Sequence, residues 1–289
     1  MDDLIAELGL PPRPETLPTS TVDAHTHLDT TTEYTGLAPD DALALAASVG
    51  VNRVVTVGCD VESSRFAVNC ATTHRQVAAA IAIHPNDIAR MSPADHEAAW
   101  EVIDELAADP AVRAVGETGL DYFRTKDPAL QGVQHESFRR HIAIAKAHDR
   151  TLMIHDRDAH DDIADILDEV GWCERTIFHC YSADEPYARR VLAHETWLSF
   201  AGNITYKANQ PMRDALAITP LDRILVETDA PFLTPVPLRG KKNASYLIPH
   251  TIRFIAEFRG VELADLCHQL RANAEQALGG SWGITEGGR

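Results

Sequence analysis

The chain has 289 residues, of which 45% are apolar and 24% are charged, the ordinary balance of a globular protein with a sizeable core. This composition disfavours a disordered chain. The 26 basic and 43 acidic residues give a formal net charge of −17, which opposes a stable duplex-binding surface because DNA phosphates need cationic partners. A polyanionic substrate would therefore need bound divalent cations to reverse the local charge.

Residues 1–21 read as an N-terminal leader that ends in the stretch Pro11-Pro12-Arg13-Pro14. The leader has no basic segment followed by a long apolar run, so we expect a cytoplasmic protein without a membrane partner. Five cysteines, widely spaced and without a C-x-x-C pair, favour reduced thiols over a disulfide framework or a zinc knuckle. Residues 22–289 are expected to form a single domain, since no linker or low-complexity tract interrupts them.

From residue 22 onward, short apolar runs alternate with longer amphipathic stretches. The predicted strands are 22–28, 53–59, 77–83, 112–117, 151–155, 176–179, 196–200 and 223–227. The predicted helices are 39–49, 93–108, 129–148, 158–170, 185–193, 212–218, 247–259 and 263–278. Ser92-Pro93 and Asp127-Pro128 each place a capping residue before a proline suited to the first helical turn. Eight β-α units in this length favour an α/β fold of the (β/α)₈ TIM-barrel type over a doubly wound sheet.

The C-terminal ends of these predicted strands carry metal-binding residue types, which is where a barrel places its catalytic groups. His25 and His27 end the first strand two residues apart, a spacing that points both imidazoles to one side. Further candidates end other strands: His84, Glu117, His155, His179 and Asp229. Each histidine alone would be an ordinary polar residue at a strand end. Their convergence on one rim predicts a site for Zn²⁺, Mn²⁺ or a similar ion.

The number of candidate ligands exceeds the four that a closed structural site needs. This excess predicts two divalent ions that share a carboxylate, with positions left open for water and substrate. The chemistry expected of such a site is hydrolysis by a metal-activated water.

Five motifs together resemble the TatD family of metal-dependent hydrolases, a group of deoxyribonucleases within the amidohydrolase superfamily. The motifs are DAHTHLD (23–29), AIHP (82–85), VGETGLDY (115–122), HCYS (179–182) and LVETDAPFLTP (225–235). They occur in the family's order, and the resemblance extends from about residue 22 to 275. The His-x-His pair alone would be shared with the wider superfamily.

The resemblance implies that His25, His27 and Asp229 bind one ion, that His155 and His179 bind a second, and that Glu117 bridges the two. It implies two divalent ions per subunit, Mg²⁺, Mn²⁺ or Zn²⁺. It also implies a deoxyribonuclease (3′–5′ exonuclease-like) that cleaves phosphodiester bonds of DNA ends or single-stranded DNA. Glu117 and Asp229 are then the catalytic residues, with Asp229 as the general base toward the attacking water.

Three further residues on the same rim are candidates for binding substrate phosphate. His84 either contacts substrate or is an ordinary histidine before a proline. Arg157 and Lys207 are either phosphate-binding groups or solvated cations. Asp121 either orients a metal ligand or caps the following turn.

The sequence departs from the usual family pattern at Asn86, Ala183 and Asn243-Ala244-Ser245, on loops expected to shape the substrate pocket. The alternative function is therefore an amidohydrolase-type barrel hydrolase of a non-nucleic-acid ester, lactone or amide, since one fold serves many reactions. A non-enzymatic protein with a vestigial metal site is disfavoured, because all six ligand positions are filled.

Overall fold

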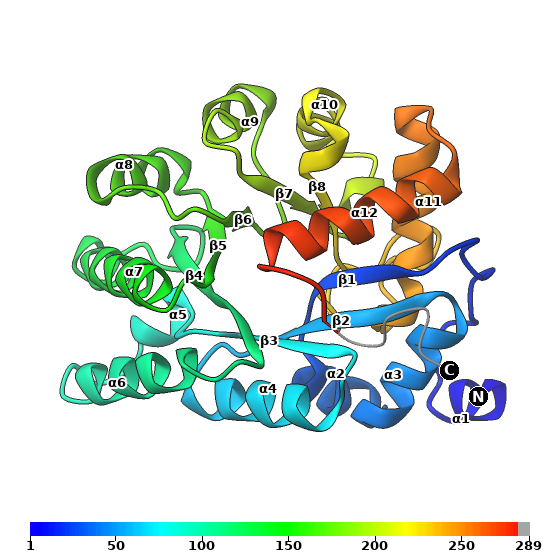
Figure 1. Ribbon diagram of the computed structural model, residues 1–289, viewed down its shortest axis with the longest axis horizontal. Coiled ribbons are helices and arrows are strands. Elements are labelled where there is room, and N and C mark those ends of the chain that lie inside the picture. The colour runs from blue at the N-terminus through cyan, green and yellow to red at the C-terminus, as the bar shows by residue number, and fades with distance from the viewer. Residues whose placement is uncertain (283–289) are drawn as a thin grey trace.

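The computed structural model describes residues 1–282, whose strands follow one another around a parallel barrel in chain order (Figure 1). The strands are β1 (Thr21–Thr26), β2 (Val51–Val57), β3 (Val77–Ile81), β4 (Val112–Asp121), β5 (Thr151–Arg157), β6 (Thr176–Phe178), β7 (Trp197–Phe200) and β8 (Ile224–Val226). A parallel bridge between Thr26 and Ala230 joins the end of β1 to the segment after β8. The predicted (β/α)₈ barrel is confirmed.

Helices surround the barrel, and α12 lies across one end of it (Figure 1). The helices are α1 (Asp2–Glu7), α2 (Leu28–Thr35), α3 (Pro39–Ser48), α4 (Val61–Thr73), α5 (Pro85–Ile88), α6 (His96–Ala107), α7 (Pro128–Ala147), α8 (His160–Val170), α9 (Glu185–Leu192), α10 (Gln210–Ile218), α11 (Ile248–Arg259) and α12 (Leu263–Ala277). Residues 1–282 also contain the 3₁₀ turns η1 (Gly202–Thr205), η2 (Leu221–Arg223) and η3 (Ser245–Leu247). Among residues 1–282, no helix combines the length and the apolar content that crossing a membrane requires.

The predicted element boundaries hold in some places and fail in others. Asp127 caps α7 as predicted, since its side chain accepts a hydrogen bond from the Ala129 amide at 2.9 Å. The start of α6 at residue 93 is wrong: the Asp95 amide donates to the Ser92 carbonyl, so this segment is a turn and the helix begins at His96. The helices α1, α2, α4 and α5 were not among the predicted segments.

Alternate positions along the strands divide between two hydrophobic cores, as the two-residue period of a strand requires. The outer core packs the strands against the helices. The inner core holds mostly small or aliphatic side chains together with the end of α12: Val22, Ala24, Val55, Val57, Ala78, Ala80, Ala114, Met153, Ile177, Leu225, Ala274, Ala277 and Leu278. Trp197 and Trp282 join this inner core. The barrel is thus a filled core, and polar chemistry is left to its rim.

The predicted leader packs against the barrel. Ile5, Leu10 and Leu17 are buried within the outer core, and the Tyr246 hydroxyl donates a hydrogen bond of 2.6 Å to the Pro11 carbonyl. Residues 1–21 therefore add buried apolar surface to the same core as the helices. The division of the chain at residue 21 stays a prediction.

A buried histidine on α7 fixes the backbone just after β3. His141 is fully buried; its Nε2 accepts the Ile83 amide at 3.0 Å, and its Nδ1 donates to the Ser137 carbonyl at 2.7 Å. The bond that Nε2 accepts requires the neutral ring, because a protonated imidazole has no lone pair left to accept it. Burial lowers the pKa of His141 to about 4, and the bond to Ser137 only partly opposes this.

We expect His141 to make stability depend on pH. Between pH 6.5 and 4 the His141 imidazole binds a proton in the unfolded chain but stays neutral in the folded chain. The free energy of unfolding therefore falls as pH falls. The loss attributable to His141 is about 3 kcal/mol at most. Urea unfolding at pH 7.5 and pH 4.5 should show a smaller loss for His141→Gln than for wild type. His268→Gln, an exposed change on α12, is the control; equal losses in all three proteins would contradict the expectation.

Candidate metal centre

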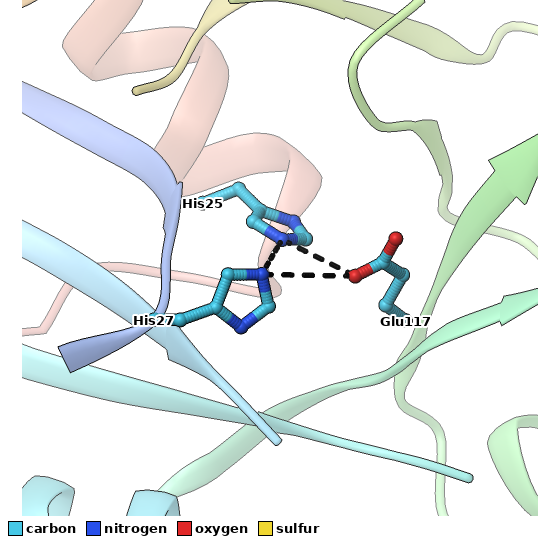
Figure 2. A group of neighbouring side chains, drawn as sticks. All are labelled: His25, His27 and Glu117. Atoms are coloured by element: carbon cyan, nitrogen blue, oxygen red, sulfur yellow. Dashed lines mark hydrogen bonds and ion pairs between the residues drawn. The ribbon is translucent and has the colours of Figure 1, made fainter. Parts of the chain in front are cut away.

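Four candidate ligands from three strand ends meet at the C-terminal rim. The Nε2 atoms of His25 and His27 lie 3.2 Å apart, and Glu117 Oε2 lies 3.6 and 3.8 Å from them. Asp229 Oδ1 lies 3.8 and 3.5 Å from the same two nitrogens. Figure 2 shows the two imidazoles turned toward the Glu117 carboxylate, which reaches them from a different strand.

These spacings fit a bound cation. A tetrahedral site with bonds of about 2.1 Å places neighbouring ligand atoms about 3.4 Å apart. The five distances that join the two imidazole nitrogens to each other and to the two carboxylate oxygens range from 3.2 to 3.8 Å. Two imidazole nitrogens and two carboxylate oxygens are also a donor set suited to a divalent ion of intermediate hardness.

Hydrogen bonds on the far sides of the two rings orient the nitrogens that face the site. His27 Nδ1 donates to the Val57 carbonyl at 2.9 Å, which leaves Nε2 with its lone pair toward Glu117. His25 Nδ1 lies 3.3 Å from the Met153 sulfur. Fixing a histidine through its other nitrogen is the usual way in which proteins prepare an imidazole for a metal.

A second group of nitrogens faces the other oxygen of the same carboxylate. Glu117 Oε1 lies 2.6 Å from His155 Nδ1, 2.8 Å from His179 Nε2 and 3.5 Å from His84 Nε2. The His25 and His179 rings stack with centroids 4.0 Å apart, so the two groups are adjacent. Glu117 therefore stands between two sets of nitrogens, with one oxygen toward each.

Burial and mutual charge dominate the electrostatics of this cluster. Burial alone would raise the pKa of Glu117, but the imidazoles of His179 and His84 hold it well below its usual range. Burial would lower the pKa of His179, but Glu117 and Glu227 hold it well above its usual value. Burial and the neighbouring His179 hold the pKa of His25 well below its usual value. Glu117 is thus an ionised acceptor among closely packed rings.

Glu227 is a functional candidate to which sequence reasoning gave no role. It is fully buried, and its Oε1 lies 3.1 Å from His179 Nδ1 and accepts the Cys180 amide at 2.9 Å. The contact with His179 turns the Nε2 of that ring toward Glu117. The available signal was the Glu-x-Asp spacing with Asp229, which mirrors His-x-His on β1.

Asp121 fills both of the roles that were left open for it. Its Oδ1 accepts the Arg124 amide at 2.8 Å, which closes the turn after β4. Its Oδ2 lies 3.4 Å from His155 Nε2, on the far side of that ring from Glu117. Asn86, one of the departures from the family pattern, donates to the same Oδ2 at 2.8 Å. Asn86 therefore supports a neighbour of the cluster.

The three substrate-binding candidates differ in their contacts with the centre. His84 belongs to it, with its side chain 13% exposed and its ring 4.6 Å from that of His155. Arg157 ends β5, two residues after His155, and its guanidinium lies over the Phe123 ring, 4.0 Å from the ring centroid. Lys207 is exposed in the turn after η1, and within residues 1–282 we find no contact between its side chain and the cluster.

Cys59 also lines the cluster, which sequence reasoning missed. Its sulfur lies 3.8 Å from Glu117 Oε2 and 3.9 Å from His27 Nδ1. Burial raises the pKa of this thiol to about 12, although the neighbouring His27 opposes the rise. All five cysteines are free, as expected.

Comparison with known sequences gives consistent matches. A family model described as TatD related DNase matches residues 22–279. An uncharacterized metal-dependent hydrolase of Mycobacterium tuberculosis is 38% identical over 264 residues, which is 90% of this chain and 98% of the relative. A Bacillus subtilis protein with the same general description is 35% identical and covers 88% of this chain and 97% of its own.

Comparison with solved structures finds the same barrel. The Escherichia coli TatD homolog YjjV superposes with a TM-score of 0.82 at 24% identity, over 90% of this chain and 98% of that one. A TatD family hydrolase of Entamoeba histolytica gives a TM-score of 0.75 at 16% identity, over 91% of this chain and 99% of its own. At these identities the structural matches establish the fold.

Proposed function

The chain belongs to the TatD related DNase family, in which its Mycobacterium tuberculosis and Bacillus subtilis relatives are described as metal-dependent hydrolases, and from this premise we propose that it is a deoxyribonuclease. The proposed reaction is 3′–5′ removal of nucleotides from DNA ends or single-stranded DNA. The observation that carries the proposal is the Glu117 carboxylate, whose two oxygens face two separate groups of imidazole nitrogens. This arrangement suits two-ion hydrolysis of a phosphodiester.

His25, His27 and Asp229 would hold one ion, His155 and His179 would hold the other, and Glu117 would contact both. Divalent ions there, Mg²⁺, Mn²⁺ or Zn²⁺, supply Lewis acidity and activate a water at neutral pH. His84 lies 3.5 Å from the same carboxylate, which makes it a candidate to contact substrate or to complete the second group.

The chain's own residues would accept the proton of the attacking water and position the substrate. Asp229 remains 15% exposed at its side chain while its Oδ1 faces His25 and His27, so a carboxylate oxygen is reachable from the open rim. A carboxylate so placed can accept the proton that the attacking water loses. Arg157, two residues after His155 at the end of β5, would pair with the negative charge of a substrate phosphate.

The test is hydrolysis of end-labelled single-stranded DNA by chelator-treated protein, with and without added Mg²⁺, Mn²⁺ or Zn²⁺. We expect mononucleotide release that metal restores and that His155→Ala abolishes, and 5′ and 3′ labels identify the end attacked. Metal binding without cleavage would overturn the nuclease proposal, and a panel of esters, lactones and amides would then test the other hydrolase reading.

Glu227→Gln should weaken metal binding and activity together. The amide keeps the shape of the carboxylate but loses its charge beside His179, and removing such a supporting partner costs about 10- to 100-fold in metal affinity or activity. Metal titration by calorimetry and turnover at saturating metal separate the two losses. The control is Glu195→Gln, the same change at an exposed turn. If Glu227→Gln and Glu195→Gln have the same metal affinity and turnover, Glu227 does not contribute to the site.

A further inference from the structure

Exposed aromatic rings gather at the rim that carries the candidate metal centre. Four aromatic side chains are the exposed ones within residues 1–282: Tyr34 at 60%, Phe123 at 53%, Phe232 at 45% and Phe258 at 39%. Three of them follow candidate ligands closely. Tyr34 lies on α2 after His27, Phe123 follows β4 and Glu117, and Phe232 comes three residues after Asp229. Exposed apolar side chains clustered at a polar site point to a ligand that covers them.

These rings form two groups on opposite sides of the centre. Tyr34 and Phe232 pack edge to face with centroids 5.7 Å apart, at the junction of β8 and β1. Phe123 lies at the β4–β5 pair, where the Tyr122 amide donates to the Arg157 carbonyl. In a ring of eight strands in chain order, these two places lie across the barrel from each other. The Glu117 carboxylate lies between them, since it reaches from β4 to the histidines of β1.

The second group combines a ring with positive charge. The Arg157 guanidinium carbon lies 4.0 Å from the Phe123 centroid, and the Lys126 nitrogen lies 5.7 Å from it. Two cations beside one ring stand out in a chain of net charge −17. An aromatic face with adjacent cations suits a ligand that alternates flat bases and phosphates.

We propose that Tyr34 with Phe232, and Phe123 with Arg157, are two platforms on which bases of a single-stranded nucleic acid stack on either side of the scissile phosphate. This inference rests on the proposed nuclease function and adds the residues that would hold the bases of its single-stranded substrate. Bases within a duplex are already stacked on one another, so an aromatic platform selects bases that are unpaired. Stacking on the platforms would also let the protein bind a nucleic acid without a broad basic surface.

The test compares two strands of equal length, one of thymidylates and one in which abasic tetrahydrofuran nucleotides keep every phosphate but carry no base. Wild-type protein with its activating metal should have a KM about ten-fold lower for the thymidylate strand, since stacking of one base contributes this order of affinity. Phe123→Ala and Tyr34→Ala should each raise KM for thymidylate several-fold and reduce the ratio between the two strands toward one. Phe258→Ala, an exposed phenylalanine near the C-terminal end of α11, is the matched control and should leave both KM values unchanged.

Other outcomes overturn the proposal and separate it from the nuclease function. Equal KM values for the two strands would overturn the platform proposal, and so would Phe123→Ala and Tyr34→Ala variants that behave like Phe258→Ala. Neither result would contradict the nuclease function. If neither strand is cleaved, the nuclease proposal fails, and fluorescence anisotropy on the same strands then decides the platforms: equal affinity for both overturns them. A dimer that Tyr34→Ala dissociates, with an unaltered ratio of KM values, would assign the rings to contact between two copies instead.

Discussion

Glu117→Gln is expected to reduce DNA hydrolysis by about a thousand-fold or more and to lower the metal content of the purified protein. Glutamine keeps the length of the side chain but removes the negative charge that faces both groups of nitrogens. Polarisation by bound ions contributes several kcal/mol to such reactions, and each 1.36 kcal/mol corresponds to ten-fold in rate. Turnover of end-labelled single-stranded DNA and metal analysis of the same preparation measure both effects.

The control is Glu97→Gln, the same chemical change on the exposed face of α6, where Glu97 pairs with Arg140. It should retain wild-type turnover and metal content. A Glu117→Gln protein with unchanged turnover and normal metal content would defeat the assignment of Glu117 as a shared ligand.

Asp229→Asn is expected to lose about 10²- to 10⁴-fold in kcat, the range contributed by a positioned proton acceptor. The asparagine amide fills the same space but cannot accept the proton of the attacking water. His25, His27 and Glu117 still surround the first ion position, so we expect metal to be retained more fully than in Glu117→Gln. Single-turnover rates at saturating metal, together with metal analysis, separate the two contributions.

Asp95→Asn makes the same substitution at an exposed position before α6 and provides the control. Asp229→Asn protein that recovers wild-type kcat when metal is raised would show that Asp229 serves only to bind the ion. Loss of kcat with full metal occupancy would support its role toward the proton.

The barrel could be predicted from sequence because its signals are local. A run such as Val51–Val57 needs only its own apolar pattern to be assigned as a strand, and chain order then supplies the sheet. The convergence of His25, His27 and Asp229 follows from the same rule, since all three stand at strand ends that meet on one rim. The residue types were therefore enough to propose where a metal would lie.

Other features depend on partners that are distant in sequence. Nothing near Glu227 in the chain indicates that it will contact His179, 48 positions earlier. The Arg157 guanidinium was expected in solvent or on a phosphate, and its contact with the Phe123 ring depends on how the β4 and β5 loops fold together. The turn before α6 was missed because Ser92-Pro93 satisfies the local rules for a helix start.

The position of Glu117 also divides the centre between two halves of the polypeptide. A break between α7 and β5, after Ala147 and before Thr151, would leave His25, His27 and Glu117 on one fragment. The other fragment would carry His155, His179 and Asp229, so neither fragment would contain a complete set of candidate ligands. Co-expressed fragments would then recover hydrolysis only on reassembly, and DNA cleavage would serve as a readout of fragment complementation.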